Sequence, residues 1–182
     1  MAIGRWCVRL RLTSMLLVLL GLPAAGRAAD CAQRAAALQA RLDAAAAQAG
    51  ARTGLEPVLA GVAAWRRDCP RHPAAPGLLR RAGLLAYERG RFDRAVSLLD
   101  ALVTGWPDRP EAVRAARLVL DSLNLQRDFA AMTPVVERYL ANAQLGRNSP
   151  RLRRELERIA MQLAFKRAEQ QPKTESPAAN AP

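Results

Sequence analysis

The sequence predicts an all-α protein built as a stack of about three antiparallel helix pairs with a capping helix at its C-terminal end. Alanine and leucine dominate the 182 residues and aromatic residues make up only 4%, a composition that favours helices. Apolar residues recur at helical spacing in runs that glycines and prolines separate. These runs also repeat along the chain at a fixed interval, as stacked helix pairs require.

The N-terminus, residues 1–28, has the layout of a secretory signal peptide. An arginine-rich start is followed by an apolar run from Met15 to Leu22 and then by small residues. A membrane-spanning helix needs about 20 apolar residues, so this run is too short and we expect no transmembrane anchor after cleavage. We place the cleavage site after Ala28, with Gly26 as the alternative.

Export determines which partners this basic protein can meet. The whole chain has a formal charge of +12, and loss of the four arginines of the signal peptide leaves 24 basic and 16 acidic residues, or about +8. A basic cytosolic protein would suggest nucleic acid as a partner, but an exported one meets envelope molecules, so no nucleic acid is expected. Cys31 follows Asp30 rather than a small residue, so lipidation is not expected. We expect a periplasmic protein, with outer-membrane association as the alternative.

The first helix pair is predicted to be closed by a disulfide bond between Cys31 and Cys69. Helices are expected over 31–49, with Asp30 as the cap, and over 56–68 after a glycine-containing turn. The two cysteines are equidistant from the centre of that turn, and such residues lie side by side in an antiparallel hairpin. They form an even pair in an oxidising compartment, where disulfides persist. Two free thiols are the alternative.

Five further helices and a tail follow the first pair. Apolar runs predict helices over residues 77–89, 92–104, 111–124, 129–143 and 150–169. Pro134 is out of place in the fourth of these, so that helix either starts at Thr133 or kinks at the proline. Residues 170–182 lack apolar content and are predicted to be disordered.

The helix pairs form an internal repeat with a period of 37 residues. Shifting the sequence by this interval superimposes apolar residues in threes: Leu55 with Phe92 and Phe129, Val58 with Ala95 and Met132, Val62 with Leu99 and Val136, and Trp65 with Leu102 and Tyr139. The prolines in the corners between helix pairs also superimpose, since Pro70 matches Pro107 and Pro73 matches Pro110. The repeat divides the domain, residues 29–169, into units of approximately 31–75, 76–112 and 113–149, with 150–169 as the cap.

The central unit carries residues at the spacing of the tetratricopeptide-repeat signature: Leu79, Gly83, Gly90, Ala95, Leu99, Leu102 and Pro107. Residues 31–169 therefore resemble tetratricopeptide-repeat proteins, although the family's own period is shorter, about 34 residues. The resemblance implies a right-handed α-solenoid in which Gly83 lies at a close helix crossing and the first helix of each pair lines a concave groove. The segment from Glu111 onward is also loosely similar to exported repeat proteins of gliding bacteria, some of which are linked to motility machinery that spans the envelope.

The sequence carries no recognisable catalytic pattern. His72 is the only histidine and lies in a loop, and no phosphate-binding loop or metal-ligand spacing is present. We therefore expect no enzymatic activity, no metal and no cofactor. The family resemblance instead implies a partner-binding groove lined by outward residues of the first helices: Arg80, Leu84, Tyr87, Glu88, Arg114, Arg117, Asp121 and Asn124. Arginines in a groove suit a carboxylate-rich peptide or C-terminus, and an ordinary solvated face is the alternative.

These observations favour an exported adaptor or scaffold that mediates protein–protein interaction in the bacterial cell envelope, for example within an envelope or motility complex. Its expected partner is another envelope protein. The alternative is a basic surface that binds envelope polyanions such as lipopolysaccharide. The sequence leaves the oligomeric state open.

Overall fold

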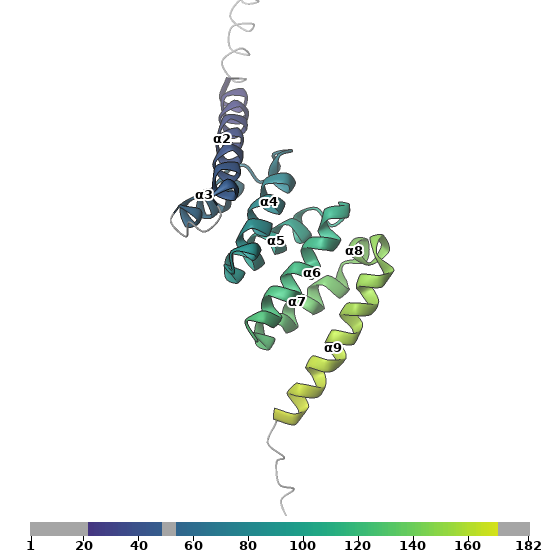
Figure 1. Ribbon diagram of the computed structural model, residues 1–182. Helices are drawn as coiled ribbons and strands as arrows, with labels where there is room; N and C mark the ends of the chain where they lie inside the picture. Colours follow the sequence, from purple (N-terminus) through teal and green to yellow (C-terminus); the bar gives the residue numbers. More distant parts are fainter. Residues whose placement is uncertain (1–21, 49–53, 171–182) are drawn as a thin grey trace, which may run out of the picture. The chain divides into compact units, whose positions relative to one another are not determined.

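All regular structure in the described part of the chain is α-helical, as the sequence predicts. The computed structural model describes residues 22–48 and 54–170, and these residues contain eight helices, α2 to α9, and no strand (Figure 1). The chain forms two compact units, one up to Leu78 and one from Leu79. Of the predicted signal peptide, residues 1–28, the part up to residue 21 lies outside the described residues, as does the predicted tail, residues 170–182, from residue 171 onward. No helix in the described part is long and apolar enough to cross a membrane.

The first unit is built from the antiparallel pair α2 (Leu22–Ala47) and α3 (Leu55–Asp68). Because α2 begins at Leu22, Asp30 lies within the helix, and the prediction that it caps the N-terminus is wrong. The alanine-rich residues before Asp30 favour helix, and proline is tolerated in a first turn, so Pro23 does not prevent the earlier start. The core of the pair is formed by Leu38, Leu42, Val58, Leu59, Val62 and Trp65.

A disulfide bond joins Cys31 in α2 to Cys69 at the C-terminus of α3, which confirms the predicted pairing. The two Cα atoms are 6.0 Å apart. Next to the bond, the indole Nε1 of Trp65 donates a hydrogen bond of 2.9 Å to the backbone oxygen of Cys31. Arg34 donates through Nη2 to Oδ2 of Asp68 at 2.7 Å. The open end of the helix hairpin is therefore held by a covalent bond and by two hydrogen bonds.

His72 lies in the corner that follows α3 and has a structural role there. Its ring meets the ring of Trp65 edge to face, with centroids 5.3 Å apart. Its Nδ1 accepts a hydrogen bond of 3.2 Å from the backbone nitrogen of Ala74. Both contacts fix the path of the chain into the next helix.

The second unit contains most of α4 and the helices that follow it, with neighbours packed antiparallel (Figure 1). The helices are α4 (Ala75–Glu88), α5 (Phe92–Gly105), α6 (Pro110–Leu125), α7 (Phe129–Ala141), α8 (Ala143–Asn148) and α9 (Pro150–Gln170). Here α5 packs against α6, α6 against α7, and α7 against α9. The core between them includes Leu79, Leu99, Leu102, Ala116, Val119, Val136, Leu152 and Leu156.

Gly83 allows α4 and α5 to approach closely, as its place in the repeat signature implies. A Cβ atom on Gly83 would lie 2.5 Å from Cγ of Leu99 and 2.6 Å from its Cδ2. Carbon atoms in contact are normally separated by about 3.5–4.0 Å, so even an alanine forces Leu99 or a helix to move.

Positions 37 residues apart agree in burial and in backbone conformation. Trp65, Leu102 and Tyr139 are 0%, 0% and 2% exposed. The turn residues Gly90 and Arg127, which are also one repeat apart, both have positive φ, 69° and 57°. Agreement in both burial and backbone conformation supports a structural repeat.

α7 differs from its sequence prediction at its N-terminus. The helix begins at Phe129 although Pro134 lies within it, so the alternative of a late start at Thr133 is wrong. The carboxylate of Asp128 stabilises this start, because its Oδ1 accepts a hydrogen bond of 2.9 Å from the backbone nitrogen of Ala131.

The short helix α8 was not predicted, because its six residues are too few to show helical periodicity. Asn142 caps it by accepting a hydrogen bond of 3.1 Å from the backbone nitrogen of Leu145, whose side chain is buried. Asn148 donates to the backbone oxygen of Pro107 at 3.1 Å. α8 therefore anchors the corner between α7 and α9.

Candidate functional site

Within the second unit, α6 carries side chains that line two separate grooves. One, the α4–α6 groove, lies between α4, α5 and α6, and the other, the α6–α9 groove, lies between α6, α7 and α9. Four predicted site residues on α6, namely Arg114, Arg117, Asp121 and Asn124, are exposed and follow helical spacing. α6 thus contributes to both grooves from one continuous face.

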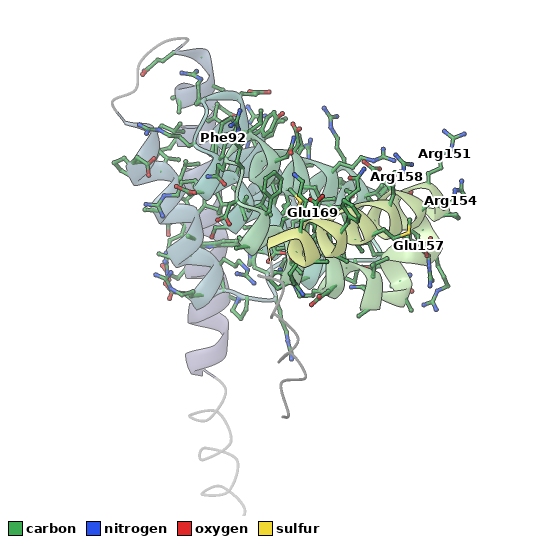
Figure 2. All side chains as sticks on the ribbon, turned by 90° about the horizontal axis from the view of Figure 1, so that it is seen from below. Phe92, Arg151, Arg154, Glu157, Arg158 and Glu169 are labelled. Carbon is green, nitrogen blue, oxygen red and sulfur yellow. A yellow bond between two sulfur atoms is a disulfide. The ribbon has the colours of Figure 1, made fainter. Side chains whose placement is uncertain are left out.

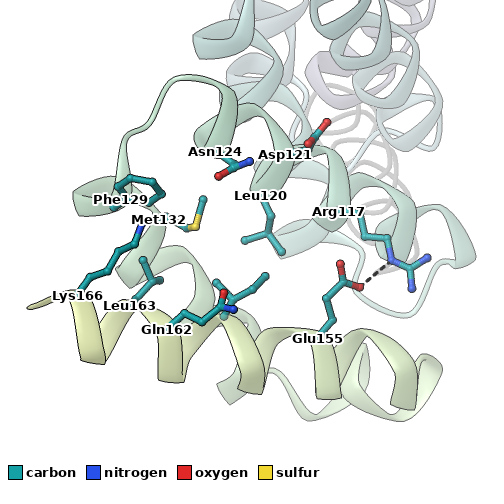
Figure 3. Close-up of a pocket in the computed structure, with 11 residues that line it drawn as sticks. Arg117, Leu120, Asp121, Asn124, Phe129, Met132, Glu155, Gln162, Leu163 and Lys166 are labelled. Carbon is teal, nitrogen blue, oxygen red and sulfur yellow. Dashed lines mark hydrogen bonds and ion pairs between the residues drawn. The ribbon is translucent and has the colours of Figure 1, made fainter.

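The α6–α9 groove has a volume of about 360 Å³ and an apolar floor with a polar rim (Figure 3). Its floor consists of Leu120, Phe129, Met132, Ile159 and Leu163. Its rim consists of Arg117, Asp121, Asn124, Glu155, Gln162 and Lys166. This combination suits a ligand that offers an apolar side chain together with polar groups at its edges.

Charged contacts mark the two ends of the α6–α9 groove (Figure 3). At one end, Nε of Arg117 lies 3.2 Å from Oε2 of Glu155, so α6 and α9 are joined by an ion pair. At the other end, Nζ of Lys166 lies 3.9 Å from the centroid of the Phe129 ring, a cation–π contact. The Lys166 ammonium has three N–H donors, and the face of the Phe129 ring does not engage all of them in conventional hydrogen bonds. N–H groups of Lys166 can therefore still donate to a ligand.

Asn124 and Gln162 lie on opposite walls of the α6–α9 groove, one on α6 and one on α9 (Figure 3). Neither side-chain amide makes a hydrogen bond to the residues that the structure describes. Each amide has donor and acceptor capacity, which matches the N–H and C=O groups of a peptide backbone. The walls can therefore bind the backbone of a ligand whose side chain occupies the floor.

The α4–α6 groove, with a volume of about 300 Å³, combines an apolar surface with two arginines. It is lined by Arg80, Leu84, Leu99, Pro110, Glu111, Arg114, Ala115 and Leu118. Arg80 and Arg114 form no ion pair or hydrogen bond within the described residues, so both guanidinium groups are available to a ligand. Oε2 of Glu111 is shielded from solvent and accepts no hydrogen bond from the described residues.

Tyr87 and Asp121 form a bridge between α4 and α6. The Tyr87 hydroxyl donates a short hydrogen bond to Oδ2 of Asp121. This bond, together with partial burial and the nearby negative charge, raises the pKa of Tyr87. The Tyr87 ring also meets Phe92 edge to face, with centroids 5.8 Å apart. The side chains of Tyr87 and Asp121 are thus engaged with each other rather than free for a ligand.

The structure distributes the eight residues predicted for the groove over different places. Arg80, Leu84 and Arg114 line the α4–α6 groove, whereas Arg117, Asp121 and Asn124 line the α6–α9 groove. Tyr87 belongs to the bridge between α4 and α6, and Glu88 is exposed and lines neither groove.

The wall that α9 contributes was missed from the sequence. Ile159 and Leu163 belong to the apolar stripe of that helix, and such a stripe has the same periodicity whether it is fully covered or borders a groove. One clue to this wall was present in the sequence, because Lys166 is one of only two lysines in an arginine-rich chain.

No family model matches the chain, and no curated protein or solved structure matches it either.

Proposed function

We propose that the protein is an exported helical-repeat adaptor that binds a segment of another protein in the bacterial cell envelope. The observation that carries this proposal is the pair of grooves beside α6, each with an apolar surface and with polar groups that lack partners among the described residues. Peptide segments commonly bind in grooves of this composition, with apolar side chains as anchors and polar contacts that fix orientation. The signal-peptide pattern of residues 1–28 supports the export.

The finer architecture that we propose is a right-handed solenoid of three helix pairs, similar to tetratricopeptide repeats, with α9 as its cap. Equal burial of Trp65, Leu102 and Tyr139, together with the 37-residue period, supports the repeat. In such a stack the first helices line one concave surface. That surface would hold an extended or helical segment across several units.

The chemistry of the grooves favours an acidic segment with apolar anchors. The guanidinium groups of Arg80 and Arg114, which have no partner among the described residues, can pair with carboxylates in two-point fashion. A leucine or phenylalanine side chain of the partner would fill the floor of the α6–α9 groove, while Asn124 and Gln162 bind its backbone.

An array of short synthetic peptides with varied acidic and apolar content tests this proposal on the protein purified after export. Peptides that combine acidic residues with leucine or phenylalanine should bind. The double variant Arg80→Gln, Arg114→Gln should weaken binding about tenfold, because two charge-assisted contacts are lost. The control variant Arg71→Gln, Arg109→Gln removes the same charge outside both grooves and should bind normally. Equal loss in both variants, or no preference among peptides, would contradict groove binding.

General polyanion binding is the second candidate, and the charge of about +8 that remains after loss of residues 1–28 supports it. Such binding falls steeply as salt rises, because exposed charges are screened. It should also be insensitive to Asn124→Ala. Groove binding shows the reverse pattern, since the substitution removes a direct contact with the ligand.

A further inference from the structure

The outward face of α9 combines exposed apolar side chains with arginines that have no ion-pair partner among the described residues. We define this face by Arg151, Arg154, Arg158, Met161 and Phe165. Met161 and Phe165 lie two residues before and after the buried Leu163. A helix turns by about 100° per residue, so both point away from the core that Leu163 enters.

The two apolar residues form one patch. Met161 and Phe165 are each 67% exposed and are separated by one helical turn. Of the other large apolar side chains in the described residues, only Leu125, at 53%, is comparably exposed. Adjacent exposed apolar residues on an otherwise polar helix face mark an interaction surface.

The arginines of this face carry charge that no acidic residue in the described part of the chain pairs with. The acidic residues beside them are already paired, since Glu155 contacts Arg117 at 3.2 Å and Glu157 contacts Arg153 at 3.1 Å. By contrast Arg151, Arg154 and Arg158 form no ion pair or hydrogen bond within residues 22–48 and 54–170. Figure 2 shows the side chains of Arg151 and Arg154 extending into solvent from one end of α9.

We infer that the outward face of α9 docks on the surface of an anionic lipid bilayer. The guanidinium groups suit lipid phosphates, and basic residues near an anionic membrane each contribute about 1 kcal/mol of attraction. Met161 and Phe165 can enter the boundary between headgroups and acyl chains, as the apolar face of an interfacial helix does. Glu169 lies one turn beyond Phe165 and is exposed, so it limits the basic stretch to the first half of the helix.

A bilayer explains both features of this face together. A soluble polyanion would pair with the arginines but would leave the apolar patch uncovered. A second copy of the chain would cover Met161 and Phe165 but would bring its own arginines close to these. An anionic membrane offers negative charge and an apolar phase side by side, which matches the composition of the face. This surface is distinct from the α6–α9 groove, so the inference does not depend on groove binding.

Sedimentation with lipid vesicles tests the inference on the protein purified after export. The protein should bind vesicles of phosphatidylcholine mixed with phosphatidylglycerol, bind pure phosphatidylcholine at least about tenfold more weakly, and lose affinity as salt rises. The triple variant Arg151→Gln, Arg154→Gln, Arg158→Gln should lose at least about tenfold in affinity. The control variant Arg67→Gln, Arg71→Gln, Arg109→Gln, with the same change in net charge at other exposed arginines, should stay within about threefold of the original protein.

A second pair of variants separates a bilayer from a soluble polyanion. Met161→Ser with Phe165→Ser should weaken vesicle binding at least about fivefold, whereas Leu125→Ser should have little effect. Circular dichroism and thermal unfolding should match the original protein, because all these positions are exposed. Three results would overturn the inference: equal binding to both vesicle types, equal loss in the two triple variants, or no effect of the Met161 and Phe165 substitutions. Failure to bind vesicles, with a dimer that dissociates when Phe165 is replaced, would assign the face to a second copy instead.

Discussion

The hydroxyl of Tyr139 donates a hydrogen bond of 2.9 Å to Oδ1 of Asp100, and Arg138 binds both oxygens of the same carboxylate at 2.9 Å. These contacts join α7 to α5. Tyr139 occupies the repeat position of Trp65, whose indole donates to α2, the helix that precedes α3. At two equivalent positions, a buried aromatic ring therefore packs in the core while its polar atom binds another helix.

The first prediction concerns this contact. Tyr139→Phe keeps the buried ring but removes the hydroxyl, and Asp100 retains its pair with Arg138. We expect the free energy of unfolding in urea to fall by about 1.5–3 kcal/mol, the value of a hydrogen bond to a charged group. Tyr87→Phe, at a more exposed site, should cost less. An equal loss at both positions would mean that burial does not strengthen the Tyr139 contact.

The second prediction concerns alkaline pH. Burial, the negative charge of Asp100 and the hydrogen bond to it raise the pKa of Tyr139 above the value near 10 of an unfolded chain. Below pH 10 both folded and unfolded states keep the phenol proton, so its contribution to stability is fully present. As pH rises above about 10, only the unfolded state loses the proton, and the free energy of unfolding decreases.

Urea unfolding at pH values from about 9 to about 11 measures this decrease. Tyr139→Phe should show a smaller decrease across the same range. The chain has only two tyrosines, Tyr87 and Tyr139, so tyrosinate absorbance in the folded protein reports both directly. Ionisation of both at the ordinary pKa would contradict the prediction.

The third prediction concerns the close crossing of α4 and α5. Gly83→Ala places a methyl group against Leu99 and should lower the free energy of unfolding by about 1–3 kcal/mol, the usual cost of overpacking. Gly77→Ala is the matched control on the same helix, because nothing lies within 4 Å of its added Cβ. The control should be neutral or more stable, since alanine favours helix over glycine. A neutral Gly83→Ala would show that the crossing tolerates a wider separation.

The fourth prediction concerns the turn that joins α6 to α7. Arg127 has φ of 57°, a conformation that costs an L-residue about 1 kcal/mol but is accessible to glycine. Arg127→Gly should therefore raise the melting temperature or leave it unchanged, because relief of strain offsets the added freedom of the unfolded chain. Gly90→Ala, at the equivalent turn, should lower it. The same direction of change in both variants would contradict the equivalence of the turns.

The fifth prediction concerns the disulfide bond. Mass mapping of the non-reduced exported protein should recover a peptide that links Cys31 to Cys69. Replacing both cysteines by serine should destabilise the first unit by up to about 4 kcal/mol, because a long loop gains freedom in the unfolded state. Trp65 contacts Cys31, so its fluorescence should report this unfolding. Two free thiols in the exported protein would refute the bond.

Hydrophobic periodicity is sufficient to predict helices that bury a continuous stripe. α5, for example, begins at Phe92 as predicted and ends at Gly105, one residue beyond the prediction. The cysteine pair was predictable because its members lie symmetrically about a turn. The helix α8 was not predictable, because its formation depends on a cap at Asn142 and on a single buried side chain, Leu145.

Much of the candidate site depends on contacts between distant parts of the chain. Arg117 and Glu155, which close one end of the α6–α9 groove, are 38 residues apart, and no local pattern links them. Phe129 and Leu163 produce the same periodic signal whether a neighbour covers them fully or leaves a groove beside them. The sequence therefore identified exposed residues on α6 but missed the opposite wall.

The position of α9 has a consequence for regulation. One helix supplies a wall of the α6–α9 groove through Gln162 and carries Met161 and Phe165 on its outward face. A ligand of either surface that shifts the position or the mobility of α9 would change affinity at the other surface. Thermodynamic linkage makes the effect mutual, so each ligand would alter the affinity of the other by the same factor.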